Sequence, residues 1–269
     1  MADATVPAAY RSIVRSRVSA QASYRTSFVV ELVSQVFIVL VEFVEVVVVF
    51  HQVDHLGGFD FAEVAMMYGI AVSAFGIADL VVGHIDQLPF YVRTGAFDAF
   101  LLRPLSPLGQ LVTSDFSLRR VGRVATGFVV LAVSLVAAGI DWTPARALLV
   151  LVTPLAGAVI FSAIFVATCT IGFYVVEGSE FANAFTYGGN YLSAYPFTVF
   201  GTVVRRFFTF VVPVGFVAYL PALALLGRPD PLGLPGWLSW SAVPVAALAW
   251  VGALAVWRNG LRHYVGAGS

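Results

Sequence analysis

Three residues in one short stretch, His51, Asp54 and His55, have side chains that commonly bind zinc. Their spacing would place them on one face of a helix, but no fourth ligand is evident nearby, and the stretch comes directly after a long apolar run. Polar residues are ordinary at such a point. We therefore interpret HQVDH as a solvated loop and predict no metal site there.

Two glutamates, Glu42 and Glu45, lie three residues apart inside that apolar run, on one face of the helix that it predicts. Ionisable groups at such depth are costly and usually face a helix bundle, a partner or a water-filled path. A role in a pathway or subunit interface and a structural ion pair are both open for them. Glu31 and Asp79 lie nearer the ends of their segments and are interpreted as interfacial.

The sequence contains no lysine, which excludes several kinds of catalysis. A Walker A loop needs a lysine to reach the nucleotide phosphates, so the chain cannot be a P-loop ATPase by itself. A Schiff base is excluded for the same reason, and no G-x-S-x-G or H-E-x-x-H pattern occurs. We predict that the chain is not an enzyme by itself and holds no cofactor, and we expect no nucleic-acid partner.

Charged residues gather in the stretch YVRTGAFDAFLLRPLSPLGQL, residues 91–111, although the sequence around it is apolar. An apolar stripe at helical spacing predicts a short amphipathic helix that starts near Asp86 and ends at Gly95. A second short helix is expected from about Phe97, and two prolines end it. The residues of this stretch that we single out are Arg93, Gly95, Asp98, Arg103 and Pro104.

The composition requires a membrane. Hydrophobic residues make up 59% of the chain and charged residues only 11%, whereas soluble domains have about 25% charged residues. A transmembrane helix needs about 20 apolar residues, and six segments meet that length without the alternation of a β-barrel. An all-α membrane protein with six spans is therefore predicted. The spans are Ser27–Phe50, Val64–Val82, Val121–Ile140, Leu148–Val176, Phe207–Leu226 and Leu238–Trp257.

The arginines predict the orientation. Thirteen of the fifteen fall on one side if the N-terminus is inside, and only Arg146 and Arg228 fall outside, so both termini are expected in the cytoplasm. In the arm of residues 1–26, three apolar residues at helical spacing favour an amphipathic helix on the inner leaflet. A disordered basic tail is the alternative there. Those three residues are Tyr10, Val14 and Val18, and residues 258–269 are expected to form a cytoplasmic tail.

Two aromatic stretches outside the predicted spans have an ordinary and a functional interpretation. Residues 177–206 form the second inner loop, which we expect to lie along or dip into the inner leaflet as an aromatic belt rather than to admit substrate. Residues 225–244 carry Trp237 and Trp240 between proline and glycine breaks. Anchoring at the outer surface is preferred there over an outer gate.

This orientation places the charged stretch in the cytoplasm between the second and third spans. Phe97, Leu101 and Leu102 are expected to pack while the charged side chains face the cytosol. The residues alone support two interpretations about equally: docking of a cytosolic partner that moves, or a loop that only links two spans.

Several stretches resemble the type-2 ABC exporter permease family, and within it the small six-span bacterial branch. They lie in matching order along nearly the whole chain. The main ones are VDHLGGFDFAEVAMMYG (Val53–Gly69), GAFDAFLLRPLSPL (Gly95–Leu108), EGSEFANAFTYGG (Glu177–Gly189), VVPVGFVAYLPA (Val211–Ala222) and WRNGLRHY (Trp257–Tyr264).

The resemblance implies the membrane subunit of an ATP-driven exporter in the bacterial plasma membrane. Two permeases, identical or related, would pair, and each would rest a coupling helix on a cytosolic P-loop subunit that binds Mg-ATP. In this chain the coupling element would be Asp86–Pro107, with the five residues singled out above as its best positions. The resemblance assigns no substrate.

Two other functions stay open from the residues. One is an integral membrane enzyme that modifies lipids with the His51 stretch or the two glutamates, although no convergent acid, base and nucleophile are evident. The other is a non-transporting membrane anchor for a cytosolic protein.

Overall fold

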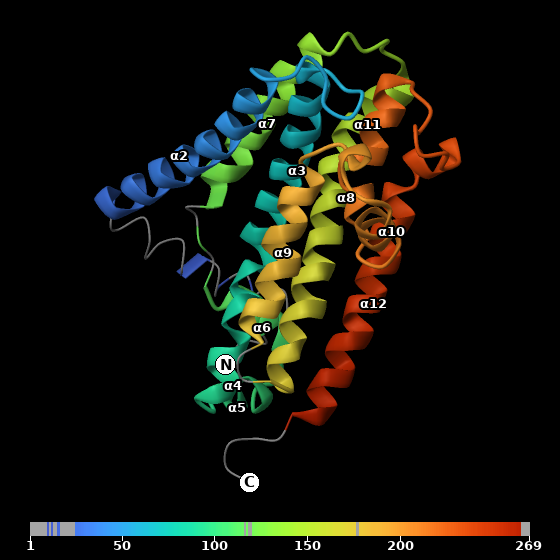
Figure 1. The fold of residues 1–269 in the computed structure, drawn as a ribbon. Coiled ribbons are helices and arrows are strands. Elements are labelled where there is room, and N and C mark those ends of the chain that lie inside the picture. The colour runs from blue at the N-terminus through green and yellow to red at the C-terminus, as the bar shows by residue number, and fades with distance from the viewer. Residues whose placement is uncertain are drawn as a thin grey trace.

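The computed structural model describes residues 10, 12, 15, 16, 25–115, 117, 120–175 and 178–264. This part of the chain is helical and contains no strand beyond an isolated bridge between Leu56 and Phe59. The predicted all-α class is therefore confirmed. Figure 1 shows long helices running beside one another, with α4 and α5 gathered at one end.

The connections between the long helices define two ends of the bundle. We call the end that holds residues 51–60, between α2 and α3, the turn end, and the opposite end, with α4 and α5, the loop end (Figure 1). The long helices are α2 (Arg25–Phe50), α3 (Phe61–Val82), α7 (Val121–Ala137), α8 (Pro144–Cys169) and α12 (Ala242–His263).

The shorter elements connect these helices. Between α3 and α7 lie η1 (Gly83–Gln87), α4 (Leu88–Arg93), α5 (Asp98–Leu101) and α6 (Pro107–Thr113). Between α8 and α12 lie η3 (Thr170–Phe173), α9 (Ser179–Ser193), η4 (Phe197–Val199), α10 (Thr202–Phe210), η5 (Val214–Phe216), α11 (Tyr219–Leu226) and η6 (Gly236–Trp240).

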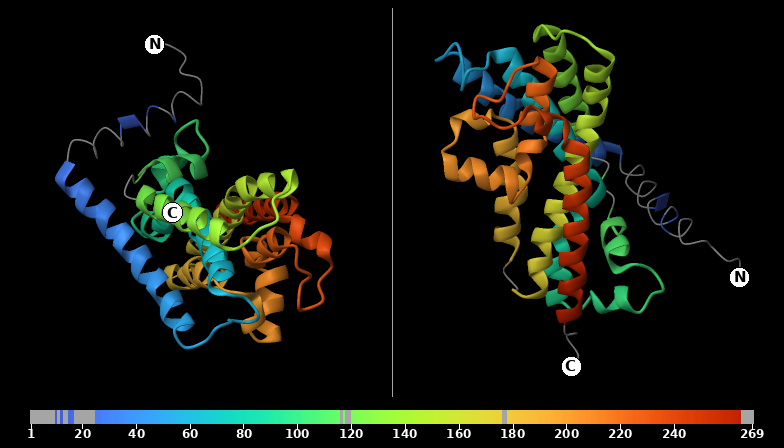
Figure 2. Two further views of the ribbon diagram at one scale, coloured as in Figure 1. Left: turned by 90° about the horizontal axis from the view of Figure 1, so that it is seen from above. Right: turned by 90° about the vertical axis from the view of Figure 1, so that its right-hand side faces the viewer.

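The core lies around α3 and α8, whereas α2 lies at the edge, as the view along the bundle shows (Figure 2). In the most apolar part of α2 only 11% of the residues are buried, compared with 72% in the helix that contains α8. α2 therefore keeps most of its surface available to lipid or to another protein.

Two glycines allow α3 and α7 to pack closely. A Cβ atom at Gly69 would lie 2.6 Å from the backbone nitrogen of Leu131, and one at Gly127 would lie 2.6 Å from that of Ser73. Small residues let membrane helices approach one another in this way. A larger residue at either position would force the two helices apart.

Four helices of the described chain are long and apolar enough to cross a membrane. They are Thr26–Phe50, Phe61–Arg93, Pro144–Phe173 and Ala242–His263, and they overlap the first, second, fourth and sixth segments expected from the sequence. α7 is also apolar, but it has only 17 residues. The chain is a multi-pass membrane protein, although length and composition support fewer spans than the six predicted.

α9 corrects the expectation that residues 177–206 lie along the inner leaflet. At the loop end, the Tyr187 hydroxyl of α9 donates a hydrogen bond to the Asp86 carboxylate, with 3.4 Å between the oxygens. Just beyond α9, the Thr198 hydroxyl donates to the Gly57 carbonyl at 2.8 Å, at the turn end. The segment therefore runs from one end of the bundle to the other. Its polar sequence, SEFANAFTYGGNYLS, explains why hydropathy did not indicate a span.

The predicted fifth span, 207–226, is not one straight helix. α10 and the segment that contains η5 and α11 meet at an angle of 74°. The break lies next to Pro213, which has no backbone N–H to continue a helix.

Both ends of this bent pair lie at the turn end. Before α10, Thr198 bonds Gly57, and after α11 the Arg228 guanidinium lies 3.5 Å from the Gly58 carbonyl. Arg205 and Arg206 lie in α10. Their assignment to the loop side, which rested on a straight fifth span, is therefore also corrected.

Most of the N-terminal arm falls outside the described residues, and so do residues 265–269. Of the three apolar residues in the predicted amphipathic helix, only Tyr10 is described. Its hydroxyl donates a hydrogen bond to the Ser106 carbonyl at 3.4 Å.

Candidate functional site

The backbone of the polar loop, by which we mean residues 86–107, follows the predicted pattern of two short helices. α4 ends with Thr94 as its C-cap, and Gly95 follows with a φ of 70°. Glycine adopts this left-handed conformation without steric cost, so the predicted turn at Gly95 is confirmed. α5 starts at Asp98 and is only four residues long, and Pro104 follows its end.

Phe97 fixes the loop to the membrane helices. Its side chain is fully buried, and its ring centroid lies 5.2 Å from that of Phe173 and 5.1 Å from that of Tyr264. Trp257 packs on both Phe97 and Phe173. We call Phe97, Phe173, Trp257 and Tyr264 the aromatic base. It joins the loop to the end of α12 and to η3, which continues directly from α8.

Asp98 is held by the chain itself rather than free in the cytosol. The Tyr264 hydroxyl donates a hydrogen bond to an Asp98 carboxylate oxygen at 2.8 Å. Burial, together with this hydrogen bond, raises the pKa of Tyr264 to about 12, so the hydroxyl keeps its proton at neutral pH. The two residues are 166 positions apart, so no local spacing could have indicated the pair.

Asp86 and Gln110 brace the two flanks of the loop. The Asp86 carboxylate accepts hydrogen bonds from the Cys169 thiol and the Tyr187 hydroxyl, each at 3.4 Å. The buried Gln110 of α6 donates to the Phe100 carbonyl at 2.8 Å and to the Leu105 carbonyl at 3.0 Å. Sequence reasoning identified neither Gln110 nor α6.

We give the name loop tip to five exposed residues of the loop: Arg93, Leu101, Leu102, Arg103 and Pro104. Leu101 and Leu102 were expected to pack, but they are 44% and 87% exposed, and Phe100 is the buried residue instead. The Arg93 guanidinium lies 6.0 Å from the ring centroid of Phe90. Neither Arg93 nor Arg103 has a carboxylate partner within the described residues. The tip thus combines unpaired positive charge with exposed leucine.

Glu42 takes part in an ion pair, one of the two roles left open by the sequence. Its carboxylate lies 3.2 Å from the guanidinium of Arg123, and the two side chains are only 14% and 10% exposed. The Arg123 guanidinium also lies 5.4 Å from the centroid of the Phe75 ring. Asp79, interpreted as merely interfacial, has a similar partner in Arg120 at 3.1 Å. These pairs join α2 and α3 to the start of α7.

Glu45 differs from Glu42 because it is exposed on α2. Its carboxylate has no hydrogen bond or ion pair with any residue that the structure describes, but it interacts electrostatically with Tyr191 and Tyr195, in and just after α9. Tyr191 is 47% exposed. A carboxylate and a phenol are therefore both exposed where α2 and α9 face outward.

His51, Asp54 and His55 are exposed in the connection after α2. No group of three His, Cys, Asp or Glu side chains that could hold a metal ion is present in the described ranges. The stretch has the exposed position expected of a solvated loop.

Comparison with known proteins agrees with this architecture. A family model described as ABC-2 family transporter protein matches residues 36–268, which include the polar loop and every described helix beyond the first turns of α2. No curated protein and no solved structure matches the chain. The chain therefore belongs to the ABC-2 transporter family and is a membrane-embedded permease of an ABC transporter.

Proposed function

We propose that this permease is half of the membrane part of an ATP-driven exporter in the bacterial inner membrane, and that the loop tip docks on a cytosolic subunit that binds Mg-ATP. The observation that carries the proposal is the contrast within the polar loop. Its tip exposes two leucines and two arginines that have no carboxylate partner in the described part of the chain, while its base is buried and bonded to the membrane helices. Export rather than uptake follows from the family resemblance.

The aromatic base explains how a push on the loop would reach the membrane. Phe97 contacts Phe173 and Trp257, so displacement of the loop moves the loop-end segments of α8 and α12 with it. ATP can bias the permease only if the docked complex has different affinities for ATP in two global states. A loop that is packed firmly on the helices couples the two states, because a movement of the docked ATP-binding subunit would also move the helices.

We assign the six spans to α2, α3, α7, α8, α9 and α12, with α10 and α11 as a re-entrant pair at the outer surface. The end-to-end course of α9 and the return of α10–α11 to the turn end support this assignment. The loop end is cytoplasmic in this topology, and four exposed arginines lie there: Arg93, Arg103, Arg258 and Arg262. This agrees with the excess of positive charge on cytoplasmic loops.

A second permease, identical or related, would cover the exposed face of α2 and α9. Helices are rarely left as exposed as α2 unless lipid or another protein covers them, and an exposed carboxylate such as that of Glu45 is costly in lipid. The translocation path would then lie between the two permeases, with Glu45 and Tyr191 facing it and Glu42 kept out of it by Arg123.

Charge reversal at the loop tip tests the docking. The chain carrying both Arg93→Glu and Arg103→Glu should insert and purify normally, since exposed substitutions usually change stability by less than about 0.5 kcal/mol. It should fail to copurify with the coexpressed ATP-binding subunit and should not support ATP-driven transport in vesicles. Arg146→Glu, the same change at the turn end, is the control and should retain the complex. A double variant that binds its partner and transports normally would contradict the docking site.

A further inference from the structure

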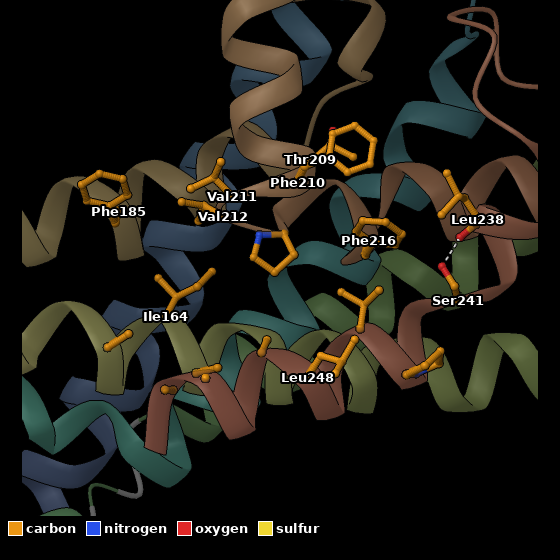
Figure 3. Close-up of a pocket in the computed structure, with 18 of the residues that line it drawn as sticks. Ile164, Phe185, Thr209, Phe210, Val211, Val212, Phe216, Leu238, Ser241 and Leu248 are labelled. Atoms are coloured by element: carbon orange, nitrogen blue, oxygen red, sulfur yellow. Dashed lines mark hydrogen bonds between the residues drawn. The ribbon is translucent and has the colours of Figure 1, made fainter. Parts of the chain in front are cut away.

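An apolar pocket lies beside the bundle, with α8 and α12 on one side and α9, α10 and η5 on the other (Figure 3). Its volume is about 660 Å³, within the ~300–1,000 Å³ typical of small-molecule sites. Figure 3 shows Ile164, Phe185, Val212, Phe216 and Leu248 around the space. None of these residues belongs to the polar loop or to the proposed path.

The chemistry of the walls excludes a polar occupant for most of the pocket. Of the lining side chains with hydroxyls, Thr168 donates to the Ile164 carbonyl and Ser241 to the Leu238 carbonyl, each at 2.7 Å. Water needs two to four polar partners to remain in a cavity, and these hydroxyls already have theirs within their own segments. An apolar chain is therefore the better occupant.

Thr209 is the exception. Its side chain lines the pocket and the residue is only 3% exposed, yet its hydroxyl makes no hydrogen bond with any residue that the structure describes. The hydroxyl also lies close to Gly215 near the ring of Phe197, on the turn-end side of the pocket. A threonine hydroxyl without a partner in the protein is free to donate a hydrogen bond, so an acceptor atom on the occupant is expected beside it.

The dimensions fit one leaflet of a bilayer. Along α12 and its N-cap the lining runs from Ser241 to Ala253, which is about 18 Å at 1.5 Å per residue. Half of a hydrocarbon core is about 15 Å thick. Trp237 borders the pocket at its turn-end mouth and is 68% exposed, as is typical of tryptophan at the level of lipid headgroups.

We infer that this pocket binds one acyl chain of a bilayer phospholipid from the leaflet at the turn end. The chain lies between α8 and α12, and its ester carbonyl accepts a hydrogen bond from Thr209. Both α8 and α12 belong to helices long enough to cross the membrane, so hydrocarbon is the solvent at the pocket's opening. The inference goes beyond the proposed transport function and stands even if that function fails.

A filling mutation provides the test. A Cβ atom added at Gly252 would meet nothing within 4 Å, so the backbone position has room for Gly252→Leu to extend into the pocket. The full chain is reconstituted in phosphatidylcholine vesicles with a small fraction of phosphatidylcholine that carries a diazirine on one acyl chain. Light then couples the probe to the protein, and mass spectrometry maps the labelled residues.

We expect labels concentrated on Ile164 and Leu248, reduced several-fold by Gly252→Leu. Ala255→Leu, on the same helix but outside the pocket lining, is the control and should leave labelling unchanged. Thr209→Val, which replaces the hydroxyl with a methyl group of similar size, should lower labelling to a smaller extent.

Three results would overturn the inference. One is that the pocket residues are labelled no more densely than the exposed face of α2, because the label would then come from bulk lipid around the protein. Another is labelling by a photoreactive free fatty acid but not by the phospholipid. The third is protection of Leu248 from the lipid probe by a second copy of the chain, seen as a cross-link between two copies when a photoreactive leucine analogue replaces Leu248.

Discussion

An arginine at the turn end is paired with a carboxylate, whereas the arginines of the loop tip are not, within the described residues. At the turn end, the Arg228 guanidinium binds both oxygens of the Glu63 carboxylate, at 2.6 Å and 2.9 Å, and Glu63 is nearly buried. Glu63 also forms a capping box with Asp60 at the start of α3. At the loop end, Arg93 and Arg103 have no carboxylate partner in the described part of the chain, and the nearby Asp98 is bonded by the neutral Tyr264.

The difference indicates that the loop tip, rather than the pair of Glu63 and Arg228, is the surface available to a partner protein. At the turn end the pair of Glu63 and Arg228 joins α3 to the segment after α11, so charge stabilises the arrangement of the helices. In the polar loop aromatic packing performs that task, and the arginines of the loop tip are left exposed. Substitutions at the two ends should therefore have different consequences: loss of stability at the turn end, and loss of coupling at the loop end.

Removing the aromatic base should have the largest effect. Phe97→Ala deletes a fully buried ring that contacts four other aromatic side chains, and such changes cost about 3–5 kcal/mol of unfolding free energy. We expect a lower melting temperature in detergent and rapid proteolysis of the polar loop. Phe90→Ala is the matched control, since Phe90 lies in the same loop but is 50% exposed. Equal effects of the two variants would contradict the role of Phe97 as an anchor.

Breaking the turn-end pair should have the next largest effect. Glu63→Ala leaves Arg228 without its carboxylate and removes the capping box, so we expect the free energy of unfolding to fall by about 1–3 kcal/mol. The loss is limited because Arg228 is half exposed and water can solvate its guanidinium. Glu180→Ala is the control. It also removes an acidic residue from the first turn of a helix, but Glu180 is exposed, so the melting temperature should change little. The melting temperature of the purified chain should fall, whereas copurification should show that the complex with the ATP-binding subunit still assembles. Dissociation of the complex by Glu63→Ala at low temperature would break the contrast between the ends.

Local patterns predicted much of this architecture from the sequence. The long apolar runs indicated the helices that contain α2, α3, α8 and α12, because a helix of spanning length needs only continuous hydrophobicity, whether lipid or the protein core covers it. Gly95 indicated the turn between α4 and α5, because few other residues adopt its backbone conformation.

Features that depend on distant contacts could not be predicted in this way. α9 is too polar for a hydropathy criterion, since its neighbours in the bundle rather than lipid cover part of its surface. The pair of Glu42 and Arg123 joins residues 81 positions apart, so Arg123 could be read only as an inner-side charge. Phe97 is buried as expected, but Leu101 and Leu102, which were also expected to pack, are exposed, and Phe100 is buried in their place.

The smallest change separates the two roles that Asp98 could have. Tyr264→Phe removes one hydroxyl and its hydrogen bond to Asp98, which should cost about 0.5–1.5 kcal/mol. If Asp98 positions the loop, Tyr264→Phe and Asp98→Leu should both lower ATPase coupling in the assembled complex. Asp98→Asn should stay near normal, because its amide oxygen still accepts from the tyrosine. If Asp98 instead contacts the partner through its charge, Asp98→Asn should lose ATPase coupling while Tyr264→Phe couples normally.

The double variant of Arg93 and Arg103, measured in the same assay, shows the effect of losing a charged contact, so the two patterns can be told apart in one series. We expect the first pattern, because the structure joins Asp98 to α12 and leaves the arginines for the partner.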